Sequence, residues 1–174
     1  LVADVEKNYP KPGLLTELKG PWNVTFNASQ RGPLAPVVFE KLQDWTTSQD
    51  DKIKYYSGTA FYNSIFNLEK LPIGEKVIIN LGEVTAMAKV TVNGIYVGGL
   101  WTSPYTLDIT KLVKVGENQL KIEVVNTWVN RLIGDAKLPA EQRLTWCPIN
   151  PYNQDSKLQV SGLIGPVRIS SVKY

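Results

Sequence analysis

The chain has 174 residues and a formal net charge of +3, and 43% of its residues are hydrophobic, which suits one globular domain. Its Lys and Arg residues are scattered, with no basic run and no aromatic-plus-basic motif of the kind that binds nucleic acid. No stretch approaches the roughly 18 apolar residues that a membrane-spanning helix needs.

The sequence up to residue 52 predicts an irregular segment followed by short elements. Residues 1–19 contain Pro10, Pro12 and Gly13 and are expected to form an irregular lead-in, which places the domain at residues 20–174. Trp22 and Phe26 belong to a run that alternates apolar and polar residues, as a half-buried strand does. Three further elements are expected: a strand at 37–39, a helical turn at 42–47 and a polar turn at 49–52.

The middle of the chain predicts a succession of strands. Residues 55–68 carry aromatic side chains on both phases of the alternation, so this strand is expected to be covered on both faces. Asn93-Gly94 favours positive φ at both turn positions, which predicts a type I′ hairpin. Other strands are expected at 77–81, 88–92, 95–97, 105–109, 120–124 and 167–172. Short strands with turn residues between them predict an all-β fold.

Residues 129–163, about 35 in number, interrupt this rhythm with little strand pattern. Connections longer than about 12–15 residues are uncommon and are often functional or disordered. This 129–163 segment contains Trp146 and Tyr152, and such aromatic residues argue against plain disorder. It is therefore a candidate functional region.

The absence of histidine limits the chemistry that the chain can perform. It excludes a Ser-His-Asp or Cys-His nucleophilic site and a His-ligated zinc site, and the single Cys147 excludes an intrachain disulfide. Most carboxylates stand beside lysines in turns, as on a solvated face, whereas Asp135, Glu141 and Asp155 lie in the 129–163 segment and permit catalysis without indicating it. No cofactor is expected. A structural calcium is compatible with a sandwich of this type, but no Asp-rich run indicates one.

Flat aromatic rings and amide or charged groups occur together after strand ends and in the 129–163 segment. An indole ring can cover the apolar face of a pyranose, while amides, carboxylates and arginines bind its hydroxyls. The residues expected to form a carbohydrate-binding surface or a domain interface are Trp101, Tyr105, Trp128, Asn130, Arg131, Asp135, Trp146, Asn150 and Tyr152.

Two alternatives apply to these side chains. Large aromatic residues also fill cores, which is the expectation for Trp22 and Trp45, and the choice stays open for Trp101 and Trp128. Arg131 and Asp135, four residues apart, are expected to form an ion pair that fixes the segment rather than a catalytic pair.

Several segments, in their order and spacing, resemble the sugar-binding, galactose-binding-like domain of family-two-type glycoside hydrolases. Two stretches are similar to the domain near the carboxyl end of large bacterial α-L-rhamnosidase-type enzymes, namely 126–135 and the pair 143–146 with 161–167. The segments that carry the wider resemblance are 20–26, 56–62, 81–84, 88–98 and 116–120.

This resemblance implies a jelly-roll β-sandwich fused in its parent to a catalytic barrel that supplies the acid and base carboxylates. It implies a secreted protein of the periplasm or cell surface of a glycan-degrading bacterium, and it assigns no catalytic residue to this domain. The expected function is a non-catalytic accessory module whose partner is a glycan or the parent's catalytic domain. The alternatives are an independent lectin-like module and, third, an enzyme in its own right.

Overall fold

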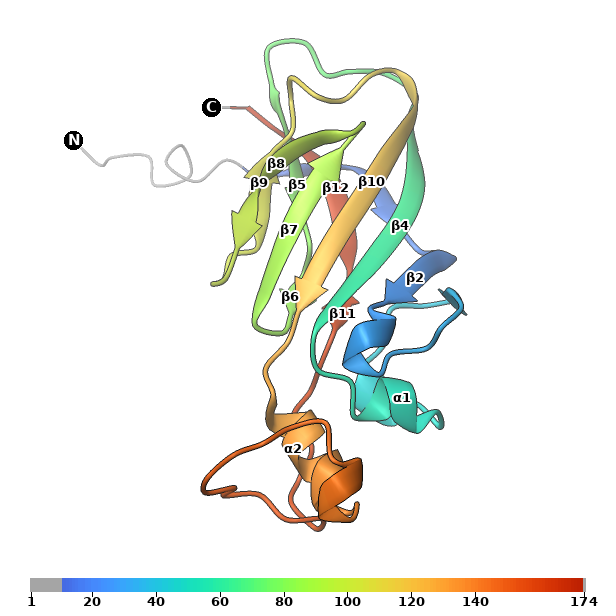
Figure 1. Ribbon diagram of the computed structural model, residues 1–174. Helices are drawn as coiled ribbons and strands as arrows, with labels where there is room; N and C mark the ends of the chain where they lie inside the picture. Colours follow the sequence, from blue (N-terminus) through green and yellow to red (C-terminus); the bar gives the residue numbers. More distant parts are fainter. Residues whose placement is uncertain (1–10, 174) are drawn as a thin grey trace, which may run out of the picture.

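Two antiparallel sheets form the body of the protein, and the computed structural model describes residues 11–173 (Figure 1). The larger sheet contains, in spatial order, β3 (Val37–Phe39), β2 (Trp22–Phe26), β4 (Thr59–Leu68), β10 (Gly116–Val125), β7 (Met87–Val92) and β8 (Ile95–Leu100). The smaller sheet contains β1 (Gly13–Leu18), β12 (Val167–Val172), β5 (Lys76–Asn80) and β9 (Thr106–Asp108). A short pair joins β11 (Leu163–Gly165) to β6 (Glu83–Val84). The prediction of an all-β jelly-roll sandwich is confirmed.

The centre of the larger sheet is the ladder between β4 and β10, which pairs Thr59 with Val125 at one end and Leu68 with Gly116 at the other. Buried and solvated residues alternate along both strands, so one face of the sheet meets the core. The expectation that residues 55–68 are covered on both faces is wrong, because Asn63, Ile65 and Asn67 are exposed on the other face. The β7–β8 hairpin turns at Asn93 (φ 51°) and Gly94 (φ 81°), as the type I′ prediction requires. Asn93 also donates from Nδ2 to the Leu112 carbonyl at 2.7 Å, which ties the turn to a neighbouring loop.

A cluster of aromatic rings fills one end of the core. Phe26 meets the rings of Phe39, Trp45 and Tyr56 edge to face, with centroids 4.8–6.3 Å apart. Such edge-to-face pairs contribute about 0.5–1.5 kcal/mol each beyond the burial of their area. Trp22 and Trp45 are completely buried, so the prediction that they belong to the core is confirmed.

The amino-terminal part differs from the prediction. Gly13–Leu18 forms β1, which pairs with β12, so the expectation of an irregular lead-in is wrong for these residues; residues 1–10 lie outside the described residues. The strand was missed because it lies at a sheet edge and is mostly solvated, and its backbone partners come from the other end of the chain. The predicted strand at 55–68 begins only at Thr59, after the 3-10 helix η3 (Trp45–Thr47) and the helix α1 (Asp51–Lys54).

The 129–163 segment forms a separate lobe beyond the end of β10 (Figure 1). It begins with the helix α2 (Val129–Ala136), continues through the 3-10 helix η4 (Ala140–Gln142) and then runs without regular structure to β11. The segment is thus a loop for most of its length, as predicted, with one short helix that the sequence pattern did not reveal.

Candidate functional site

Buried amide and hydroxyl groups fasten the 129–163 segment to the sandwich. Asn126 accepts from the Gly58 backbone N–H at 2.9 Å and donates to the Tyr56 carbonyl at 2.8 Å and to Ser161 Oγ at 3.2 Å. Asn130 donates to the same Ser161 Oγ at 3.0 Å. Both ends of the segment are therefore held by one network, as buried polar groups require.

Asn130, Arg131 and Asp135 are buried on α2 and serve the segment itself. Asn130 exchanges hydrogen bonds with the backbone of Gln159, and Arg131 Nη1 lies 3.3 Å from Asp135 Oδ1. The predicted ion pair is confirmed. The expectation that Asn130 and Asp135 present polar groups to a glycan needs correction, because their side chains are enclosed and engaged within the chain.

Asp135 also shapes the stretch that follows α2. Its Oδ2 accepts hydrogen bonds from the backbone N–H of Leu144 at 2.9 Å and from the backbone N–H and hydroxyl of Thr145 at 2.8 and 2.7 Å. These charge-assisted bonds place the next residue, Trp146, on a fixed backbone. The carboxylate thus positions an exposed ring, which is different from a catalytic role.

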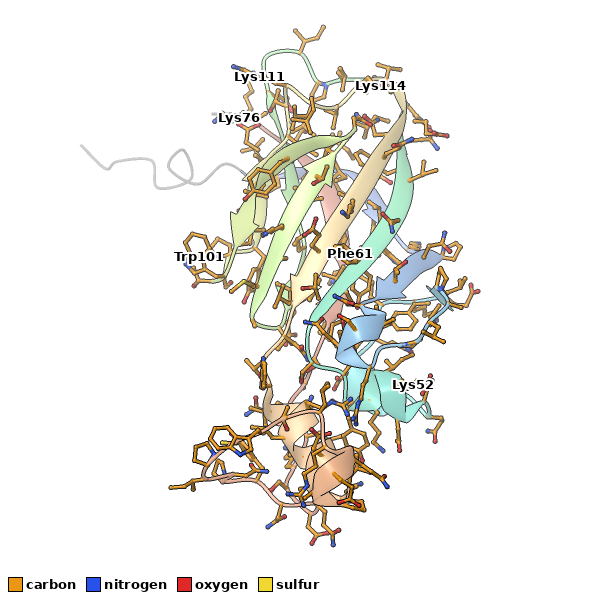
Figure 2. All side chains as sticks on the ribbon, viewed as in Figure 1. Lys52, Phe61, Lys76, Trp101, Lys111 and Lys114 are labelled. Atoms are coloured by element: carbon orange, nitrogen blue, oxygen red, sulfur yellow. The ribbon has the colours of Figure 1, made fainter. Side chains whose placement is uncertain are left out.

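Three of the predicted tryptophans lie on the surface. Trp101, directly after β8, is 73% exposed, Trp128 at the start of α2 is 63% exposed, and Trp146 is 84% exposed. Figure 2 shows the Trp101 side chain standing out from the edge of the sandwich. Of the two alternatives left open for Trp101 and Trp128, burial in the core is therefore excluded.

Other apolar side chains of the 129–163 segment are exposed as well, namely Leu144, Ile149 and Val160. Trp146 belongs to the same segment, and Trp128 directly precedes it. Exposed apolar groups concentrated in one segment indicate a surface that another molecule or domain covers.

The remaining predicted site residues are less prominent. Tyr105 is half-buried and packs against the core, while Asn150 and Tyr152 form a turn in which Asn150 Oδ1 accepts from the Tyr152 backbone N–H at 3.0 Å. Asn150 is exposed and Tyr152 half-buried, so both stay available for contact.

Asp44 and Ser161 hold the segment and were not predicted. Asp44 Oδ1 accepts from the Ser161 backbone N–H at 3.0 Å, across 117 residues of sequence. Ser161 begins the 161–167 stretch that carries part of the resemblance, but no sequence pattern pairs it with Asp44, so only the folded chain reveals this contact. Within residues 11–173, no group of three or more His, Cys, Asp or Glu side chains is arranged to hold a metal ion. No helix in the same range is long and apolar enough to cross a membrane.

Comparison with known proteins identifies the family. Residues 16–147 match the family model described as glycosyl hydrolases family 2, sugar binding domain. The chain belongs to this family. The match includes all six strands of the larger sheet, β5 and β9 of the smaller one, Trp101, Trp128 and the whole of α2, and it ends before β11 and β12.

Two relatives are similar over almost the whole of this sugar-binding domain. It is 40% identical to the rhamnosidase from Novosphingobium sp. PP1Y, with a TM-score of 0.87, covering 94% of this chain and 15% of that one. It is 35% identical over 195 residues to a Formosa agariphila protein named "Putative beta-glucuronidase", covering 98% of this chain and 16% of that protein. The chain therefore spans a small part of the length of these larger relatives.

A more distant structure shares the fold. The β-D-glucuronidase of Dictyoglomus thermophilum is 21% identical, with a TM-score of 0.65, and the match covers 95% of this chain and 29% of that one. At this identity the likeness shows a common architecture alone.

Proposed function

We propose that the chain is a non-catalytic accessory module of a larger, rhamnosidase-type glycoside hydrolase. In this proposal the module packs on the catalytic domain of its parent, and its exposed tryptophan rings contact the glycan. The family membership and the 40% identity to a rhamnosidase that is several times longer support the proposal. The likeness also supports a rhamnose-containing glycan as substrate of the parent and a location in the periplasm or outside the cell.

The observation that carries the proposal is the exposure of three indole rings on loops that are otherwise firmly held. Trp22 and Trp45 show that the sandwich can bury tryptophan completely, whereas Trp146 is 84% exposed. Leaving so large an apolar side chain in water forgoes roughly 1.5–3 kcal/mol of burial free energy, which contact with a partner would recover. An indole face suits the C–H face of a sugar ring, and an apolar surface of this kind also suits a domain interface.

An independent lectin-like module is the second candidate, and the same exposed rings favour it. The two candidates differ in what the isolated chain does. A lectin binds its glycan tightly as an isolated domain. An accessory module needs its parent enzyme to position it, so replacing its tryptophans should change the properties of the full-length enzyme.

We expect Trp146→Ala to weaken glycan binding about tenfold or more, the loss typical of a central aromatic contact. A glycan array with the 174-residue chain identifies the ligand, and isothermal titration calorimetry measures the affinity. Ile73→Ala is the control, because it truncates another exposed apolar side chain, in the turn between β4 and β5, that is not among the predicted site residues.

The parent enzyme separates docking from glycan contact. If Trp146 docks the module, Trp146→Ala lowers the thermal midpoint of the full-length enzyme and leaves the glycan affinity of the isolated chain unchanged. If neither the glycan affinity nor the full-length enzyme responds to Trp146→Ala, the proposal is wrong.

A further inference from the structure

An open pocket of about 420 Å³ lies between the 28–34 region, α1 and α2, at the lower end of the molecule in Figure 1. Its volume falls in the range of small-molecule sites. Its lining is largely apolar but includes four cationic residues, Arg31, Lys52, Arg131 and Lys137, and one carboxylate, Asp51. The three stretches are far apart in sequence, so this collection of charge exists only in the folded chain.

Arg131 is the unusual member of the pocket. It is 7% exposed, and among the described residues its guanidinium donates one hydrogen bond, from Nη1 to Asp135 Oδ1 at 3.3 Å. Its Nε–H is buried without a partner. A buried guanidinium normally satisfies most of its five donors, and each donor left unpaired costs free energy. The planar fork therefore remains competent to bind an oxyanion.

Asp135 meets this demand at one donor. Its Oδ1 pairs with Arg131 Nη1, while three donors from Leu144 and Thr145 occupy its Oδ2. A second anion, bound in the pocket, would accept charge-assisted hydrogen bonds from the guanidinium donors of Arg131 that have no partner.

Another part of the lining holds a cation beside an aromatic ring. Lys137 Nζ donates to Tyr55 Oη at 2.6 Å and lies 4.9 Å from the centroid of that ring. This hydrogen bond holds the pKa of Lys137 above its ordinary value, so the ammonium stays charged at neutral pH. Asp51 and Asp155 act on the same ammonium electrostatically, and the remaining lining includes the apolar side chains of Leu34 and Leu138.

We propose that this pocket binds the carboxylate or sulfate group of an acidic sugar unit in a glycan. Arg131, Lys52 and Lys137 surround the charge, and Leu34 and Leu138 offer apolar contact to the C–H face of the ring. The volume fits a sugar ring better than one acidic protein side chain. The inference extends the proposed function by naming an anionic glycan and a second contact that does not use the tryptophans.

The first test follows the Arg131 Nε–H signal in ¹⁵N-correlated NMR spectra. We expect sodium glucuronate to shift this signal saturably, while glucose, the neutral analogue, leaves it in place. Sodium sulfate at matched ionic strength measures the affinity for the bare charge and should bind more weakly than glucuronate. Either no shift with glucuronate or equal affinity for free sulfate would overturn the proposal.

The second test uses charge-removing variants at the two ends of the molecule. Figure 2 places Lys52 beside the lower end and Lys114 at the upper end, and both side chains are exposed. Lys52→Gln should weaken glucuronate binding about two- to fivefold, the effect of one exposed charge. Lys114→Gln makes the same change in net charge and should leave the affinity unaltered. Equal weakening by both variants contradicts a local site.

Two further measurements separate the competing explanations. Trp146→Ala should not change the glucuronate affinity. The proposal for the pocket and the proposal for the exposed tryptophans can therefore fail separately. In the full-length parent, calorimetry should show glucuronate binding that is sensitive to Lys52→Gln. Binding by the isolated chain that disappears in the parent would mean that an acidic side chain of a neighbouring domain occupies Arg131, and would overturn the glycan assignment.

Discussion

The Tyr62 hydroxyl connects β4 of the larger sheet to Trp45 and to Leu163. Its Oη lies 2.6 Å from the donor Trp45 Nε1 and 3.3 Å from the backbone N–H of Leu163. The hydroxyl is enclosed, and desolvation raises the pKa of Tyr62 well above its ordinary value, despite the opposing effect of these two hydrogen bonds. Both donors would be buried without a partner if the hydroxyl were removed.

We therefore expect Tyr62→Phe to lower the free energy of unfolding at neutral pH by about 1–3 kcal/mol, the cost of unpaired buried donors. Chemical denaturation monitored by fluorescence measures this loss. Tyr96→Phe is the control, because it removes an exposed hydroxyl and should change stability by less than about 0.5 kcal/mol.

Tyr62→Phe should also change how the free energy of unfolding depends on pH, because the pKa of Tyr62 is raised in the folded protein. Tyr62 contributes fully to the free energy of unfolding below its unfolded-state pKa of about 10. This contribution is lost as the pH rises toward the higher folded-state pKa, because the unfolded chain then releases the Tyr62 proton and the folded chain does not. Stability should fall less steeply above about pH 10 in Tyr62→Phe than in the unaltered chain. Identical alkaline profiles would contradict this assignment.

At the scale of elements, the 129–163 segment depends on contacts made at its two ends. Asn126 follows β10 directly and joins the stretch before β4 to Ser161, just ahead of β11. Gly134 lets α2 lie against Tyr55, since a Cβ at this position would fall 2.7 Å from Tyr55 Cγ. The segment can therefore lack regular structure over most of its length and still present Trp146 on a defined backbone.

Asn126→Ala should destabilise the protein by about 1–3 kcal/mol and loosen the segment, because it leaves the Gly58 N–H and the Tyr56 carbonyl unpaired. Hydrogen exchange should accelerate in 129–163 more than in the central strands. Asn67→Ala, an exposed position in β4, is the control and should be nearly neutral. Uniform acceleration across the sheets would argue against a local anchor.

For the whole molecule, the arrangement of carboxylates bears on catalysis. A glycosidase needs two carboxyl groups facing one sugar bond, about 5–10 Å apart. Asp135 is buried and bound to backbone donors, and the described cationic pocket has Asp51 as its lining carboxylate. Asp135 thus serves a structural contact, and the non-catalytic role stays part of our proposal.

We expect the isolated chain to show no hydrolysis of aryl-rhamnosides or aryl-glucuronides in a chromogenic assay. The full-length parent serves as the positive control, since its catalytic domain supplies the acid and base in our proposal. Turnover that persists through repurification of the 174-residue chain would overturn the non-catalytic assignment.

Much of the sandwich could be predicted from local pattern. Alternating residues located β2, β5, β7 and β10, and Asn93-Gly94 located the hairpin, because a half-buried strand and a type I′ turn impose their requirements on neighbouring residues. Trp146 is exposed, and the functional role of the 129–163 segment stays a prediction. The edge strand β1 and the short β6–β11 pair escaped prediction because their partners are remote in sequence.

The sequence by itself determined the fold class, the absence of histidine chemistry and the tryptophan-bearing loops. Only the tertiary structure decided which polar residues are free: it enclosed Asn130 and Asp135 and gathered Arg31, Lys52 and Lys137 around Arg131. The physical reason is that strand periodicity is a local property, whereas burial and charge clustering depend on which distant segments meet. Here the distant segments are brought together where α1 and α2 lie at the end of the sandwich (Figure 1).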